Sequence, residues 1–156
     1  MLKEKLVELA KKEVGVEEVD GTNCGVRVNQ YKDATWLDEK KGWPWCAAFI
    51  CFLFQQGMKD KKYTFERPQT PSAYGFEGWC LNQDKSVLLK RSGKISKGDI
   101  VIFNFSHIGI AIEDEANGVV LTIEGNTDQA GSREGGGVYI KQRKRSLIRS
   151  FIKIMV

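Results

Sequence analysis

We expect an α+β fold in which N-terminal helices pack on an antiparallel sheet of about five strands. Helical spacing of apolar residues dominates the chain up to residue 57, whereas short β-branched and aromatic runs follow one another from Gly98 onward. The connections between those runs are short and contain no helical pattern, as antiparallel pairing allows. A chain of 156 residues is of ordinary single-domain size, so we interpret residues 1–156 as one domain.

The first two expected helices lie before residue 38. Residues 2–13 repeat apolar side chains at intervals of three and four, which predicts an amphipathic helix that Gly15 ends. Its expected apolar face consists of Leu2, Leu6, Leu9 and Ala10. After a turn-forming run at 20–25, residues 26–37 have helical potential. The inward side chains of that segment are expected to be Val28, Tyr31 and Trp36.

The third expected helix is buried in the body of the domain. Pro44 suits an early helix position, where its missing N–H is not needed, and the run from Cys46 to Gly57 is apolar almost all round. Prolines and glycines then interrupt residues 59–83, which we expect to form a long surface segment with one helix at 72–79.

The expected strands of the sheet all follow Gly98. They are the runs DIVIFNF, HIGIAIE, VVLTIE, GVYIKQR and IRSFIKI, which turn residues separate. The sequence Glu115-Ala116-Asn117-Gly118 predicts a hairpin between the second and third runs, because Asn and Gly accept the left-handed backbone of a tight turn.

Charge and hydropathy exclude several classes of protein. No stretch approaches the ~18 uninterrupted apolar residues of a membrane span, so we expect no integral membrane association. Charges interrupt the N-terminal apolar positions, so we find no signal peptide and expect synthesis in the cytoplasm. The net charge of +4 favours either a solvated basic face or an anionic polymer as partner, but no motif indicates nucleic acid. The basic excess lies in Lys141, Arg143, Lys144, Arg145 and Arg149.

The cysteine pattern argues against a structural metal site. The four cysteines are Cys24, Cys46, Cys51 and Cys80. They form no C-x-x-C pair and a single histidine accompanies them, so we expect no zinc. Synthesis in a reducing compartment argues against a disulfide network, and pairing of Cys24 with Cys80 after export stays open.

Two residue types in the chain suit nucleophilic catalysis. His107 is the single histidine, and histidine both accepts and donates protons near neutral pH. Cys46 lies at the start of the buried helix, where the helix dipole favours a thiolate and backbone N–H groups hold an oxyanion. Each residue alone is more often structural than catalytic, but together they form a nucleophile and a base. Cys51 lies farther along the helix and is assigned to the core.

A nucleophile and its base also need a group that orients the imidazole. Glu124 and Asn126 are the candidates, because they end a strand expected to lie beside the strand that His107 opens. Asp99 and Asp114 are poorer choices, since Asp99 belongs to a turn at the far end of its strand. The candidates to line a substrate cleft are Trp43, Trp45 and Trp79, although core packing is the commoner role of such side chains.

The segments GWPWCAAFICFLF, KGDIVIFNFSHIGIAIE and LTIEGNT resemble the CHAP family of cysteine, histidine-dependent amidohydrolases and peptidases, which is related to NlpC-type cell-wall peptidases. The upstream GTNCGVRVNQY and the closing IRSFIKI extend the resemblance over nearly the whole chain. The resemblance implies a papain-like fold, with Cys46 as nucleophile, His107 as base and Glu124 as third member. Asn126 matches a nearby polar position.

The resemblance also implies the substrate, bacterial peptidoglycan. We expect a monomeric, phage-lysin-like amidase or endopeptidase that acts on the cell wall after release and needs no cofactor. Some relatives bind calcium through an acid-rich loop, but the corresponding stretch here offers only Asp38 and Glu39 among lysines, so no metal is expected. Two alternatives stay open: a catalytically silent wall-binding or interaction module, and an interbacterial amidase toxin with an immunity protein as partner.

Overall fold

A computed structural model describes residues 1–38 and 42–156, and all elements named below belong to these ranges. The helices are α1 (Leu2–Glu13), α2 (Val26–Asp33), α3 (Cys46–Gly57) and α4 (Gly75–Leu81), with a short 3-10 turn η1 (Arg145–Leu147). The strands are β1 (Val87–Lys90), β2 (Ile100–Phe103), β3 (Ile108–Ala111), β4 (Val119–Thr127), β5 (Gly137–Lys144) and β6 (Ile148–Ile154). They form one sheet in the order β1-β6-β2-β3-β4-β5, in which all neighbours are antiparallel.

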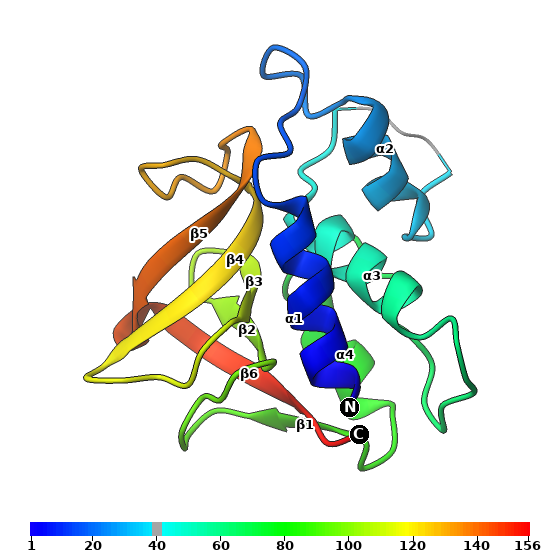
Figure 1. Cartoon of the computed structure of the whole chain (residues 1–156), viewed down its shortest axis with the longest axis vertical. Coiled ribbons are helices and arrows are strands. Elements are labelled where there is room, and N and C mark those ends of the chain that lie inside the picture. Colours follow the sequence, from blue (N-terminus) through cyan, green and yellow to red (C-terminus); the bar gives the residue numbers. More distant parts are fainter. Residues whose placement is uncertain (39–41) are drawn as a thin grey trace.

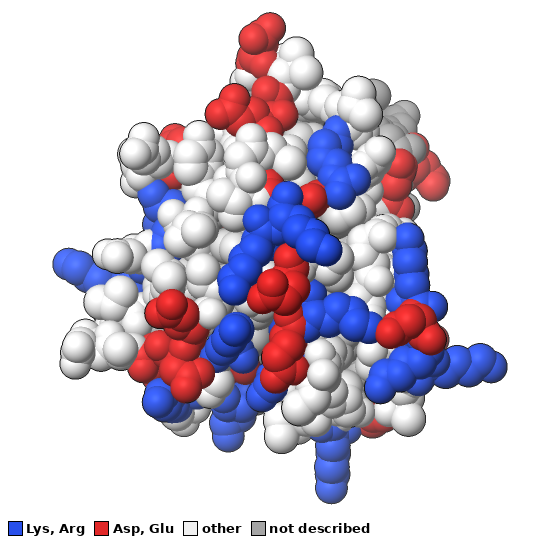
Figure 2. Space-filling model, in the orientation of Figure 1, with Lys and Arg blue, Asp and Glu red and all other residues white. Residues whose placement is uncertain are grey.

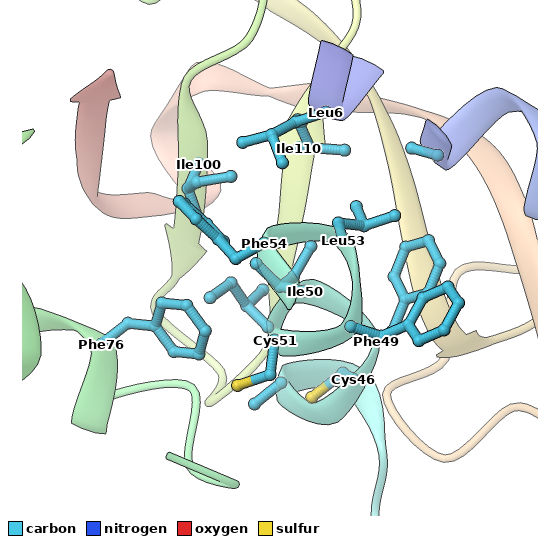
Figure 3. Close-up of a cluster of buried hydrophobic side chains, with 14 of the residues drawn as sticks. Leu6, Cys46, Phe49, Ile50, Cys51, Leu53, Phe54, Phe76, Ile100 and Ile110 are labelled. Carbon is cyan, nitrogen blue, oxygen red and sulfur yellow. The ribbon is translucent and has the colours of Figure 1, made fainter. Parts of the chain in front are cut away.

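Helix α3 lies at the centre of the core. Every residue from Cys46 to Phe54 is buried, which explains why this helix is apolar on all sides. Helices α1 and α3 contact each other, and both pack on the sheet at β3 (Figure 1). The side chains around α3 come from α1, β2, β3 and α4, and Figure 3 labels Leu6, Ile100, Ile110 and Phe76 among them. Helix α3 also contacts β4, so its first turn lies close to the strand that carries Glu124.

The expected α+β architecture is confirmed, with six strands in place of about five. The additional strand is β1, a four-residue edge strand that pairs with β6 and is too short to show a clear alternation in sequence. The hairpin between β3 and β4 turns at Asn117 and Gly118, whose φ angles of 52° and 72° are left-handed as expected.

Three local expectations need correction. Trp36 is 63% exposed, because α2 ends at Asp33 and the chain has already left the helical path where this side chain would face inward. Pro44 precedes α3, whose N-cap is Trp45, so the proline helps the chain enter the helix from outside it. Helix α4 begins at Gly75, three residues later than expected.

The basic residues near the C-terminus do not form a continuous basic face. Arg143 is only 8% exposed, while Arg145 pairs with Glu115 at 3.5 Å and Arg149 pairs with Glu77 at 3.0 Å. Figure 2 shows basic and acidic side chains interspersed on the face that carries α1. Within the described residues, none of the helices combines the length and apolar character needed to traverse a lipid bilayer.

Candidate active site

Cys46 is the first residue of α3 and is 4% exposed. The first hydrogen bond within the helix runs from Phe49 N–H to the Trp45 carbonyl, at 2.9 Å. The backbone N–H groups of the three residues before Phe49 therefore have no partner in the preceding turn. They belong to the first turn of α3, which begins at Cys46, and N–H groups at a helix start suit the stabilisation of a negative charge.

Asn126 fixes the backbone immediately before Cys46. Its Oδ1 accepts a hydrogen bond from Trp45 N–H at 2.7 Å, and its Nδ2 donates to the Gly135 carbonyl at 2.7 Å. The residue has a left-handed φ of 57° at a register shift of β4 between Glu124 and Thr127. Asn126 is thus a buried brace between β4 and the start of α3, and it does not contact His107 through any hydrogen bond of the described residues.

His107 lies at the turn that leads into β3 and is fully buried. Its Nε2 shares a 2.7 Å hydrogen bond with Glu124 Oε1, and its ring stacks on Phe103 and Phe105 at centroid distances of 5.7 Å. The turn before it is held by Tyr74, whose hydroxyl donates to the Asn104 carbonyl and accepts from Ser106 N–H, both at 2.9 Å. These contacts orient the imidazole before any substrate binds.

Glu124 is a buried carboxylate held by four groups. It accepts hydrogen bonds from His107, from Thr122 Oγ1 and from two guanidinium nitrogens of Arg143, with Arg143 Nε at 2.8 Å. Burial alone would raise the pKa of Glu124, but the hydrogen bonds from Arg143 and His107 outweigh it and hold that pKa at about 2. Glu124 is therefore ionised at neutral pH in spite of its burial.

Cys46 and Glu124 act together on the imidazole. Burial lowers the pKa of His107, but the interactions with Cys46 and with Glu124 outweigh burial and raise that pKa to about 9. The second ring nitrogen, Nδ1, is buried and forms no hydrogen bond of ordinary geometry within the described residues. Since Nε2 already binds Glu124, Nδ1 is the ring nitrogen that has no partner among the described residues.

Two glycines of the HIGI and EGN segments make this arrangement sterically possible. A Cβ atom at Gly109 would lie 2.7 Å from Glu124 Cγ. Strand β3 therefore leaves room for the Glu124 side chain only because residue 109 is a glycine. A Cβ atom at Gly125 would lie 2.9 Å from Phe49 Cβ and from the Trp45 ring, so β4 approaches the start of α3 directly. Both glycines bring the elements of the site within contact distance.

A cavity of about 290 Å³ opens beside the cysteine. Its lining includes Cys46, Trp43, Pro44, Ser106 and Arg133. A second cavity, of about 350 Å³, lies between α1, α2 and α3 and does not include Cys46. Of these two cavities, the first has Cys46 in its lining.

The structure separates the three tryptophans that were expected to line the cleft. Trp43 is 48% exposed and lines the cavity beside Cys46. Trp45 is fully buried, with its indole N–H donating to Glu18, because it caps α3 from inside the core. Trp79 packs against Phe54 of α3, and its indole N–H donates to the Glu66 carbonyl. Only Trp43 among these three lies where it could contact a substrate in the described cavity.

The remaining candidates lie outside this site. Burial raises the pKa of Cys51, whose sulfur donates to the Thr70 carbonyl at 3.3 Å, and burial raises the pKa of Cys80 to about 11. The structure contains no disulfide between the four cysteines, all of which lie in the described ranges. Asp99 binds Lys153 at 2.9 Å and has no hydrogen bond to His107 among the described residues. Glu39, which was considered for calcium, lies outside the described residues.

Arg143 is the charged partner of Glu124 that the sequence did not identify, and Thr122 is a second, uncharged one. Arg143 was counted among exposed basic residues, whereas its side chain stacks over Phe103 and Phe105 and binds Glu124. Alternation along β5 puts Arg143 on the same face as Lys141, which pairs with Thr122, so knowledge of the strand register would have revealed it. The loop of nine residues between β4 and β5 leaves that register undetermined by turn chemistry.

The fold and the site define an α+β domain in which a cysteine at a helix start meets a buried histidine and a buried carboxylate, the constellation that nucleophilic catalysis uses. No family model matches the chain, and no curated protein matches it. Among solved structures, the chain is similar to the wild-type endolysin LysIME-EF1, with a TM-score of 0.59 and 17% sequence identity. The similarity covers 97% of this chain and 63% of that endolysin, and at this identity it shows the fold alone.

Proposed function

We propose that this protein is a peptidoglycan hydrolase that cleaves an amide or peptide bond with Cys46 as nucleophile. The observation that carries the proposal is the buried pair of His107 with the ionised Glu124, together with the interaction with Cys46 that raises the pKa of His107. Similarity in fold to an endolysin supports the choice of cell wall as substrate. The site of action is then the wall, reached after release from the cell that makes the protein.

The first half of the reaction forms a thioester. The Cys46 sulfur, having given its proton to His107, attacks the carbonyl carbon, and the carbonyl oxygen takes up negative charge beside the first N–H groups of α3. When the tetrahedral species collapses, the C–N bond breaks and His107 gives its proton to the leaving amine. The second half uses water: His107 accepts a proton from it, the hydroxide adds to the thioester, and the acid product leaves as the thiol is restored.

Glu124 and Arg143 support these proton transfers without touching the reacting atoms. Glu124 fixes the ring through Nε2 and stabilises the imidazolium formed at each step. Arg143 keeps Glu124 ionised and fixed in position, so that its proton affinity stays far below that of the imidazole. Both are positioning residues, as is Asn126 at the entrance to α3.

The proposal is tested by release of soluble fragments from purified peptidoglycan, with mass spectrometry of the products. Cys46→Ala is expected to abolish release, whereas Cys51→Ser, a change in the same helix that keeps a donor for the Thr70 carbonyl, is expected to retain it. Equal release by wild type and Cys46→Ala would show that the cysteine mechanism is wrong. The masses of the fragments identify the bond that is cut.

Fragment release separates the first alternative from the proposal, and the second alternative requires a binding measurement as well. A silent wall-binding module would sediment with peptidoglycan and release nothing. An amidase toxin would release fragments and also bind a dedicated immunity protein that blocks the Cys46 cavity.

A further inference from the structure

Among the described residues that line the cavity beside Cys46, one has a charged side chain, Arg133. Resting on the proposed hydrolase function, we propose that Arg133 binds a carboxylate of the substrate close to the scissile bond, so that the preferred substrate is an acidic peptide stem.

The composition of the cavity favours an anion. Apart from Arg133, the described residues of the lining have apolar or uncharged side chains, including Trp43, Pro44 and Ser106, and none of these residues is acidic. Among the described residues of the lining, a carboxylate meets one cation and no like charge, and the nearest competing acid is Glu134 beside Arg133. The cavity volume of about 290 Å³ suits a short peptide segment rather than a folded protein surface.

The contacts of the Arg133 guanidinium leave it able to bind a substrate carboxylate. Its Nε donates to the Ser106 carbonyl at 2.9 Å, which anchors the guanidinium next to the residue that precedes His107. Its Nη1 contacts the neighbouring Glu134, whose side chain is 61% exposed, and its Nη2 has no hydrogen bond to any described residue. An exposed ion pair of this kind contributes little free energy. A substrate carboxylate can therefore replace Glu134 as the partner of Arg133 with little loss of stability.

The anchor to Ser106 gives the guanidinium a fixed orientation, and a planar guanidinium binds a carboxylate through two parallel hydrogen bonds. A carboxamide offers one oxygen and one NH2 group instead, and the NH2 group faces a donor. Arg133 therefore distinguishes a free carboxylate from its amide at the same position. Lysine at this position would keep the charge and lose the paired geometry.

The test compares two synthetic muramoyl tetrapeptides that differ only in whether the stem carboxylates are free or all converted to carboxamides. Binding is measured by calorimetry on Cys46→Ala, which leaves Arg133 intact and avoids turnover. We expect the free form to bind about tenfold to a hundredfold more tightly. Adding Arg133→Gln is expected to bring the ratio close to one, and Arg133→Lys to give an intermediate ratio.

Lys94→Gln serves as the matched control, because it removes one exposed positive charge from outside the cavity. This change is expected to leave the ratio unaltered. If Arg133 only held the Ser106 turn, its replacement would weaken both ligands equally and preserve the ratio, which would overturn the inference. A ratio near one in Cys46→Ala, or no binding of either form, would overturn it as well. Hydrolysis of the two peptides by wild type is measured separately, so failure of the hydrolase proposal is seen independently of the binding ratio.

Discussion

Replacement of Arg143 by methionine should destabilise the protein far more than a surface arginine change would. The variant deletes two charge-assisted hydrogen bonds and leaves the Glu124 carboxylate buried with only Thr122 and His107 as partners. Removal of one member of a buried ion pair costs about 3–5 kcal/mol. For a chain of this length each kcal/mol lowers Tm by roughly 2–4 °C, so we expect a fall of about 10 °C.

A double-mutant cycle measures the coupling that this reasoning requires. Glu124→Gln should cost less than Arg143→Met, because Arg143 keeps its 3.2 Å bond to the Gly131 carbonyl and its contact with Phe103. The double variant removes both charges, so it should be more stable than the sum of the single losses implies, by about 2 kcal/mol. Free energies of unfolding from urea titrations at pH 7 provide the test. Additivity within about 0.5 kcal/mol would refute the buried pair as a stabilising unit.

Two further predictions concern the histidine and the cavity aromatic. Because the folded pKa of His107 is about 9 and the unfolded value is near 6.5, its stabilisation is complete below pH 6.5 and is lost as pH rises to about 9. Urea titrations at both pH values should show a loss on the order of 3 kcal/mol that His107→Gln lacks, and an equal loss in that variant would contradict the assignment. Trp43→Ala should raise KM with little change in Tm, because Trp43 is half exposed at the cavity. Trp45→Ala should lower the free energy of unfolding by about 3–5 kcal/mol, because Trp45 is fully buried. Similar changes in Tm for the two variants would show that Trp43 is also a core residue.

The helices of the site could be predicted from local pattern. The amphipathic spacing of residues 2–13 and the uniformly apolar run after Cys46 match α1 and α3 closely. A helix buried on one side has an apolar stripe in its sequence, and a helix buried on all sides is apolar throughout. Placement of Cys46 at the helix start followed from the same pattern. The hairpin at Asn117 followed from turn chemistry that is equally local.

What the sequence did not reveal depends on contacts between distant residues. Arg143 lies on an alternating polar strand, and nothing in that strand alone says that one arginine faces a buried acid nineteen residues away. The different positions of Trp43 and Trp45 were equally hidden from local sequence. One proline separates the two residues, yet Trp43 lies at the cavity and Trp45 lies in the core. Such outcomes depend on strand register and on the path of the chain into α3, which no local window contains.

The close approach at Gly109 and Gly125 has a consequence for how this protein would look in saturation mutagenesis. Every substitution at either position adds at least a Cβ atom within 3 Å of Glu124 or of the Trp45 and Phe49 side chains. In a library scored by the proposed hydrolysis of peptidoglycan, both positions would therefore tolerate as little variation as Cys46 and His107. The intolerant positions would then include some that are needed for chemistry and others that are needed only for close packing. A parallel measurement of protein abundance would separate the two kinds of position.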